Sequence, residues 1–236
     1  MKKLFILFLF FSACLTYAQN EVYDYGNYYL RAENSTLKAF AKDSTLIYQR
    51  QFFNPQFFAV DLDSDYVNEI VVIDNNIINK RKNYTLFVFN TLDSIYIADS
   101  INSGSTEPYQ VYSKEQNTIL LVTGNAAFDS LNTIDSLSYL PLNFWKFEDG
   151  ALYLANVSVY DPYIAENDNI IDLIEEYYLQ NGRSCESTRK IKGAIASGFI
   201  NYMVIGEKTF ASQFLKNYYL CSDFDAFKQF LLKTLK

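Results

Sequence analysis

Four acidic side chains at regular spacing are the residues of this sequence best suited to chemistry. Three stand two positions apart and the fourth follows four residues later: Asp61, Asp63, Asp65 and Glu69. Carboxylates at this spacing can fold around one hard cation, and the backbone carbonyl of Val67 can supply another oxygen. Without a cation, their mutual repulsion would oppose folding. We therefore expect a calcium site at these five residues, the alternative being a solvated acidic turn.

Two apolar runs, residues 57–60 and 70–73, flank these acids and are typical of buried strands. With the loop between them they resemble the FG-GAP or VCBS repeat of integrin α-chain-like β-propellers, in which D-x-D-x-D-G-x-x-D precedes an aliphatic strand. This resemblance, close over residues 57–73, implies a propeller-type blade with calcium in the loop. Tyr66 stands at the family's glycine, where the turn usually needs left-handed backbone. One repeat later Lys114 stands at the third ligand position, so at most one site is expected.

The region that must position this loop, residues 19–162, alternates β-branched and aromatic residues with polar ones in short runs. Such alternation predicts strands and hairpins. A shift of 49 residues aligns apolar positions without a gap, for example Leu37 with Leu86 and Ile70 with Ile119. A period near 50 residues with about four strands lies in the range of propeller blades. We expect an antiparallel all-β part of two to three blade-like repeats.

The remaining residues, 163–236, show apolar side chains at intervals of three and four, which predicts helices. The expected boundaries are an end near Gly182, a helix from Ser184 or Ser187 to Met203, a start at Thr209, and a start at Ser222 with Asp225 in a capping-box-like pair. The predicted fold class is therefore α+β, with blade-like strands followed by a small C-terminal helical unit. Cys185 and Cys221 form an isolated pair, most simply a disulfide in an oxidising compartment.

The N-terminus predicts export. Lys2 and Lys3 precede an apolar run and Ala18 ends a peptidase-type site, so residues 1–18 are expected to be a cleavable signal peptide. The alternative is a lipoprotein anchored at Cys14, which follows Phe11-Ser12-Ala13 in a lipobox-like order. No later stretch reaches the roughly 20 apolar residues of a transmembrane helix. The mature chain is expected to be periplasmic, displayed on the cell surface or secreted.

Charge and composition narrow the function classes. Removal of Lys2 and Lys3 leaves 18 of the 20 basic residues against 27 acidic ones, and the net charge changes from −7 to −9. This charge argues against a nucleic-acid partner. An enzyme is not expected, because the sequence has no histidine and no recognisable nucleophile or phosphate loop. We expect a binding or structural module that recognises a protein or glycan; the alternatives are a metal-free periplasmic inhibitor or immunity-type protein, and an accessory to a glycan-active enzyme.

Overall fold

The computed structural model describes residues 21–92, 94–132 and 139–235. The predicted signal peptide and Cys14 lie outside these residues. The chain divides into two compact units, one ending at Gln51 and the other beginning at Phe52. None of the helices in the described residues is both long enough and apolar enough to cross a membrane.

The first unit is a four-stranded antiparallel sheet in which each strand pairs with the next along the chain. Its strands are β1 (Glu21–Asp24), β2 (Tyr28–Glu33), β3 (Thr36–Ala41) and β4 (Leu46–Gln51). Burial alternates along β2, where Leu30 is buried and Arg31 is only partly so. On the Arg31 side of the sheet, Tyr29 and Phe40 stack with ring centroids 5.2 Å apart, and the Arg31 guanidinium lies over Phe40.

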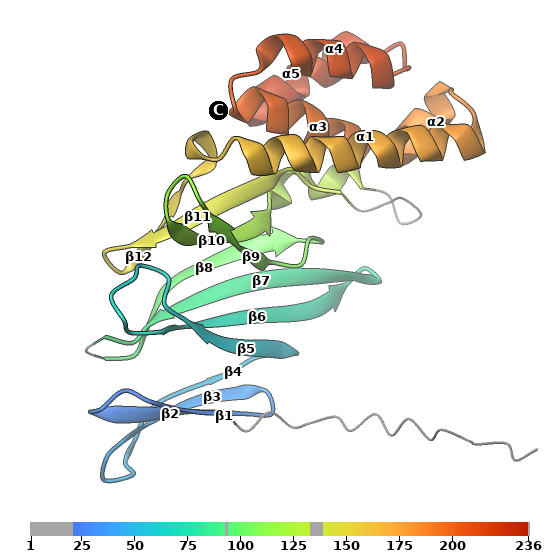
Figure 1. The fold of residues 1–236 in the computed structure, drawn as a ribbon. Coiled ribbons are helices and arrows are strands. Elements are labelled where there is room, and N and C mark those ends of the chain that lie inside the picture. The colour runs from blue at the N-terminus through green and yellow to red at the C-terminus, as the bar shows by residue number, and fades with distance from the viewer. Residues whose placement is uncertain (1–20, 93, 133–138, 236) are drawn as a thin grey trace, which may run out of the picture. The chain divides into compact units, whose positions relative to one another are not determined.

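The second unit begins with two further four-stranded antiparallel sheets (Figure 1). One contains β5 (Pro55–Val60), β6 (Glu69–Ile78), β7 (Arg81–Asn90) and β8 (Tyr96–Gly104), and the other contains β9 (Tyr109–Ser113), β10 (Thr118–Gly124), β11 (Leu142–Glu148) and β12 (Ala151–Leu154). Both are meanders with neighbouring strands in chain order. Apolar side chains of both sheets share one core, in which Val71 and Leu86 of the first sheet meet Leu121 and Phe147 of the second.

The predicted repeat corresponds to equivalent strands. Leu37 and Leu86 lie on β3 and β7, each the third strand of its sheet, while Ile70 and Ile119 lie on β6 and β10, each the second. The antiparallel all-β part is thus confirmed as three four-stranded sheets, and none of them closes on itself. Residues 151–159 alternate in the way that predicts a strand, but β12 ends at Leu154. There Asn156 accepts a hydrogen bond from the Phe144 amide at 2.7 Å, and the chain turns into a short 3-10 helix, η2 (Asn156–Ser158).

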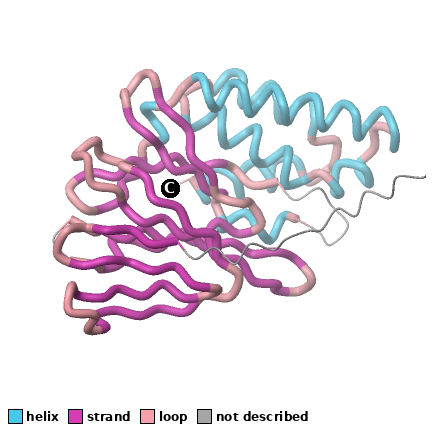
Figure 2. The backbone as a smooth tube through the Cα atoms, turned by 60° about the horizontal axis from the view of Figure 1, so that its bottom comes forward, coloured by secondary structure: helices cyan, strands magenta, loops and turns pink. Residues whose placement is uncertain are grey.

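Helices complete the second unit and lie against the sheet of β9–β12 (Figures 1 and 2). They are α1 (Asp161–Asn181), α2 (Cys185–Lys190), α3 (Lys192–Val204), α4 (Lys208–Tyr218) and α5 (Phe224–Thr234), with the 3-10 helix η1 (Ala126–Leu131) between β10 and β11. Tyr163 of α1 is fully buried in their contact with the sheet; its ring centroid lies 4.9 Å from that of Phe144, and its hydroxyl donates to the Leu142 carbonyl. Because of this shared core, the helices and the sheet of β9–β12 belong to one compact unit, which begins at Phe52.

Helix boundaries follow local chemistry with two departures from the predictions. Pro162 lies in the first turn of α1, where its missing amide hydrogen is harmless, and Gly182 with φ 79° follows the end of α1. The predicted single helix from Ser184 to Met203 is two helices, because the chain leaves helical geometry at Ile191. The predicted capping box at Ser222 does not form: α5 begins at Phe224, and no side chain caps it.

The two cysteines lie at the helical end of the second unit. Their sulfur atoms are 2.01 Å apart, the length of a disulfide bond, between the first residue of α2 and the segment before α5. The bond would close a loop with a sequence separation of 36 residues. It therefore ties the start of α2 to the segment that precedes α5. The core of this helical part is made chiefly of side chains from α1, α3, α4 and α5.

Candidate metal site

The acidic loop connects β5 to β6 and is held at Leu62, which is fully buried between the two sheets. Glu69, the first residue of β6, accepts a hydrogen bond from the Leu62 amide at 2.9 Å. The Thr118 hydroxyl, on β10 of the other sheet, donates to the Leu62 carbonyl at 3.0 Å. Both backbone polar groups of this residue are thus satisfied, and the first turn of the loop has a fixed position.

The three aspartates converge on one region of space. One carboxylate oxygen from each of Asp61, Asp63 and Asp65 lies within 4.8 Å of the others. Backbone amides of the loop hold these carboxylates: those of Asp65 and Tyr66 donate to the Asp61 side chain at 3.1 and 3.0 Å, and that of Val67 donates to Asp65 at 2.7 Å. Hard cations bind to clusters of carboxylate oxygens, so this arrangement can hold a divalent cation such as calcium.

The backbone of the loop is tightly turned. Ser64 and Tyr66 both have left-handed conformations, with φ values of 66° and 70°. Tyr66 takes this conformation at the position where the FG-GAP pattern has glycine, and its side chain is 95% exposed. The ring therefore gains little from packing that could offset the backbone strain of a bulky left-handed residue.

Glu69 differs from the three aspartates. It is buried and is not a member of the group whose ligand oxygens lie within 4.8 Å. Burial, together with the charges of Asp63 and Asp65, raises the pKa of its carboxyl to about 7, although the hydrogen bond from the Leu62 amide acts to lower it. Burial and then the charge of Asp65 also raise the pKa of Asp63. A bound cation would favour the ionised form of each of these groups.

No protein-family model, curated protein or solved structure matches this chain. The candidate site therefore stands on its own geometry. Within the residues that the structure describes, the three aspartates are the one group of three or more metal-ligand side chains brought together in this way. The loop one repeat later, between β9 and β10, is a short turn in which Ser113 accepts a hydrogen bond from the Gln116 amide, and it forms no such group.

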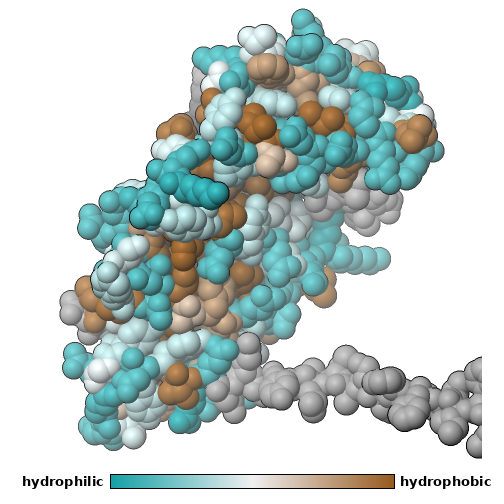
Figure 3. Space-filling view, viewed as in Figure 1, coloured by the Kyte–Doolittle hydropathy of each residue, from teal (hydrophilic) through white to brown (hydrophobic). Residues whose placement is uncertain are grey.

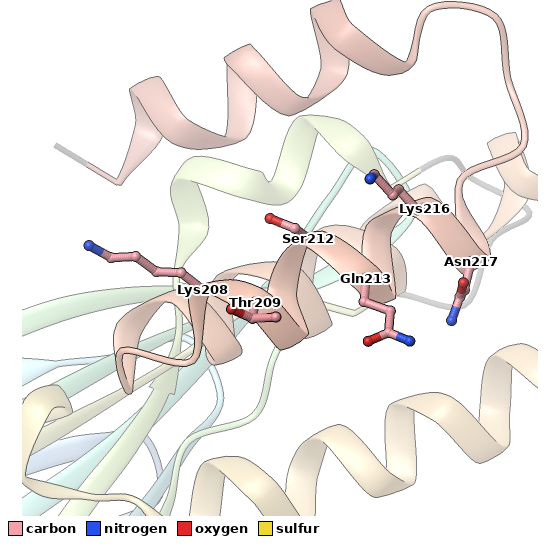
Figure 4. A pocket seen from close by; sticks show the side chains of 6 residues that line it. All are labelled: Lys208, Thr209, Ser212, Gln213, Lys216 and Asn217. Atoms are coloured by element: carbon pink, nitrogen blue, oxygen red, sulfur yellow. The ribbon is translucent and has the colours of Figure 1, made fainter.

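A hollow on the helical part, unlike the acidic loop, does not bring its polar side chains together. It has a volume of about 590 Å³ and is lined by polar residues of α4, namely Lys208, Thr209, Ser212, Gln213, Lys216 and Asn217. Figure 4 shows that their side chains are spread along the helix, with Lys208 and Lys216 at opposite ends. On the face shown in Figure 3, apolar residues of the helical part lie singly or in small groups among polar ones. Neither feature gathers side chains around a common point.

Sequence reasoning did not find the residues that anchor the acidic loop. Leu62 lies between two of the expected ligands, and Thr118 lies 56 residues away. The aliphatic side chain between Asp61 and Asp63 was the available signal for Leu62, because leucine is among the residues most often buried. Nothing local in the sequence marks Thr118, whose role arises only when the two sheets pack together.

Proposed function

We propose that this chain is an exported, non-enzymatic binding or structural module whose Asp61–Glu69 loop binds one calcium ion that stabilises the fold. The observation that carries this proposal is the convergence of Asp61, Asp63 and Asp65 within 4.8 Å in a loop fixed at both ends by strands. Like charges this close oppose folding unless a cation offsets them.

The proposed ligands follow the order of a calcium loop with oxygen donors at alternate positions. Asp61, Asp63 and Asp65 supply side-chain oxygens, and Val67 supplies its carbonyl. In such loops the next alternate position often acts through a water molecule. Glu69 occupies that position here. A role through a water molecule fits its carboxylate, which accepts a hydrogen bond from the Leu62 amide and is not one of the three converging carboxylates.

We further propose that each four-stranded sheet is a blade of the FG-GAP type. Support comes from the chain-order meander of each sheet, the 49-residue spacing between equivalent strands, and the position of the acidic loop between the first two strands of its sheet. Blades of this kind present their connecting loops to partners, and we propose a protein or glycan as the partner class. Export of the module is supported by the N-terminal sequence and by the cysteine pair.

Calcium titration tests the metal proposal. Calorimetry on chelator-treated protein should show binding at or below millimolar calcium. Binding to the native state alone should add about 2.7 kcal/mol to the free energy of unfolding at a hundredfold excess over Kd. For a chain of this size the melting temperature should rise by roughly 5–10 °C.

The matched variants are Asp63→Ala and Asp172→Ala, which remove the same charge from the loop and from an exposed position on α1. Asp63→Ala should abolish the calcium-dependent rise in melting temperature, and Asp172→Ala should retain it. If wild-type protein shows neither a heat of binding nor a shift in melting temperature at millimolar calcium, the metal proposal is refuted and the loop is a solvated acidic turn.

A further inference from the structure

A second cavity lies between the sheet of β9–β12 and α1, away from the acidic loop. Its volume is about 240 Å³, and it is lined by Thr106, Tyr109, Tyr139, Leu140, Leu142 and Glu166. Leu140 and Leu142 are buried and give it an apolar wall, whereas Tyr109 is 42% exposed. Since a water molecule occupies about 30 Å³ in the liquid, the cavity has room for a small organic group.

Two glycines, Gly104 and Gly124, pack closely against lining residues of the cavity near Thr106. Thr106 donates its amide to the Ser103 carbonyl and accepts from the Ser103 hydroxyl, which closes a turn after β8. A Cβ atom at Gly124 would lie 2.7 Å from both Thr106 and the Ser103 carbonyl, and one at Gly104 would lie 2.8 Å from Leu140. Side chains at either glycine would therefore push apart the residues that line the cavity.

Among the residues that the structure describes, the half-buried carboxylate of Glu166 has no cationic partner. No ion pair of the described residues involves Glu166, and the undescribed segment 133–138 contains no lysine or arginine. Burial raises the pKa of the Glu166 carboxyl, and the neighbouring polar side chains of Asn169 and Tyr139 lower it. Burial and the charge of Glu166 raise the pKa of Tyr109 and of Tyr139 to about 12, so both rings stay neutral near pH 7.

We propose that this cavity binds an alkylammonium group, presented either as a lysine side chain of a partner protein or as a free amine. A carboxylate within a partly enclosed space favours a cation and forms charge-assisted hydrogen bonds with its N–H groups. Aromatic rings attract cations to their faces, and the cavity carries two tyrosines. Leu140 and Leu142 supply apolar surface for the methylene groups of the ligand. The proposal is independent of calcium binding.

The test measures binding of two matched probes, Nα-acetyl-lysine methylamide and Nα-acetyl-norleucine methylamide, which differ in the ammonium group. Wild-type protein should bind the lysine probe at least about tenfold more tightly. Glu166→Gln should lose that preference. Asp168→Asn removes the same charge from an exposed position two residues along α1 and should retain the preference. Equal affinity for the two probes in wild-type protein, or equal losses in both variants, would overturn the proposal.

Two further arms complete the design. Putrescine is titrated beside the lysine probe: tighter binding of putrescine identifies a free amine as the ligand, and tighter binding of the lysine probe identifies a protein side chain. If Glu166→Gln fails to fold, Tyr139→Phe keeps the ring and removes only its hydroxyl from the lining of the cavity. It should weaken binding of the lysine probe severalfold, and unchanged affinity would count against the proposal. Titrations run in chelator and in calcium separate a failure here from a failure of the calcium site.

Discussion

Tyr66→Gly should stabilise the protein, because Tyr66 has φ 70° and a side chain that is 95% exposed. A left-handed conformation costs a residue other than glycine roughly 1–2 kcal/mol. Loss of the exposed ring removes almost no buried area, while glycine adds about 0.5–1 kcal/mol of backbone entropy to be lost on folding. The net gain in the free energy of unfolding should be roughly 0.5–1 kcal/mol, or about 1–4 °C in melting temperature.

Tyr66→Ala is the matched control for this prediction. It removes the ring but keeps the Cβ atom that causes the strain, so its melting temperature should stay close to that of wild-type protein. Thermal unfolding followed by circular dichroism, in chelator and in calcium, measures both variants. The gain from Tyr66→Gly should appear both in chelator and in calcium, since the strain arises from the backbone conformation of Tyr66 and not from the binding of an ion. If glycine and alanine give the same melting temperature, the reasoning about strain at this position is refuted.

Three other outcomes are expected. Replacing both Cys185 and Cys221 by serine should lower the free energy of unfolding by roughly 3–4 kcal/mol in urea, as expected for a disulfide-closed loop with a sequence separation of 36 residues; an unchanged value would mean that the bond contributes no stability. Thr118→Val leaves the Leu62 carbonyl without its donor and should cost about 1–3 kcal/mol in the same assay, with Thr118→Ser as the rescuing variant. Glu166 has a pKa above the ordinary value of 4.5 in the folded protein. The stability that it contributes is therefore full below pH 4.5 and is lost as pH rises through the folded pKa. Glu166→Gln should flatten this part of the curve of unfolding free energy against pH, and a curve identical to that of wild-type protein would contradict the assignment.

The strands and long helices were accessible from the sequence because each buries one face, and burial leaves a period that can be read along the chain. The alternation over residues 36–41 predicts a strand with the bounds of β3, and α1 ends where Gly182 predicts. The break at Ile191 was not accessible, since its apolar spacing continues through it. The position of Asn156 was also hidden, because its side chain replaces a strand hydrogen bond only once β11 is beside it.

The candidate site shows the same division between local and distant causes. The spacing of the three aspartates predicted that they can converge, and Tyr66 has the left-handed backbone that the turn was expected to need at this position. The burial of Glu69 was less accessible, because a carboxylate is rarely buried and only the packed sheets make it so. The second cavity was beyond reach, since Thr106 and Glu166 come together only through the tertiary fold.

The hydrogen bond from Thr118 to Leu62 has a consequence for how the second unit opens. It joins the acidic loop of one sheet directly to a strand of the next, at a residue that is itself part of their shared core. The two sheets are thus expected to exchange their amide hydrogens as one cooperative unit, so that neither sheet opens independently of the other. An ion held by three side chains next to Leu62 would then slow exchange in β10, a strand that it does not touch.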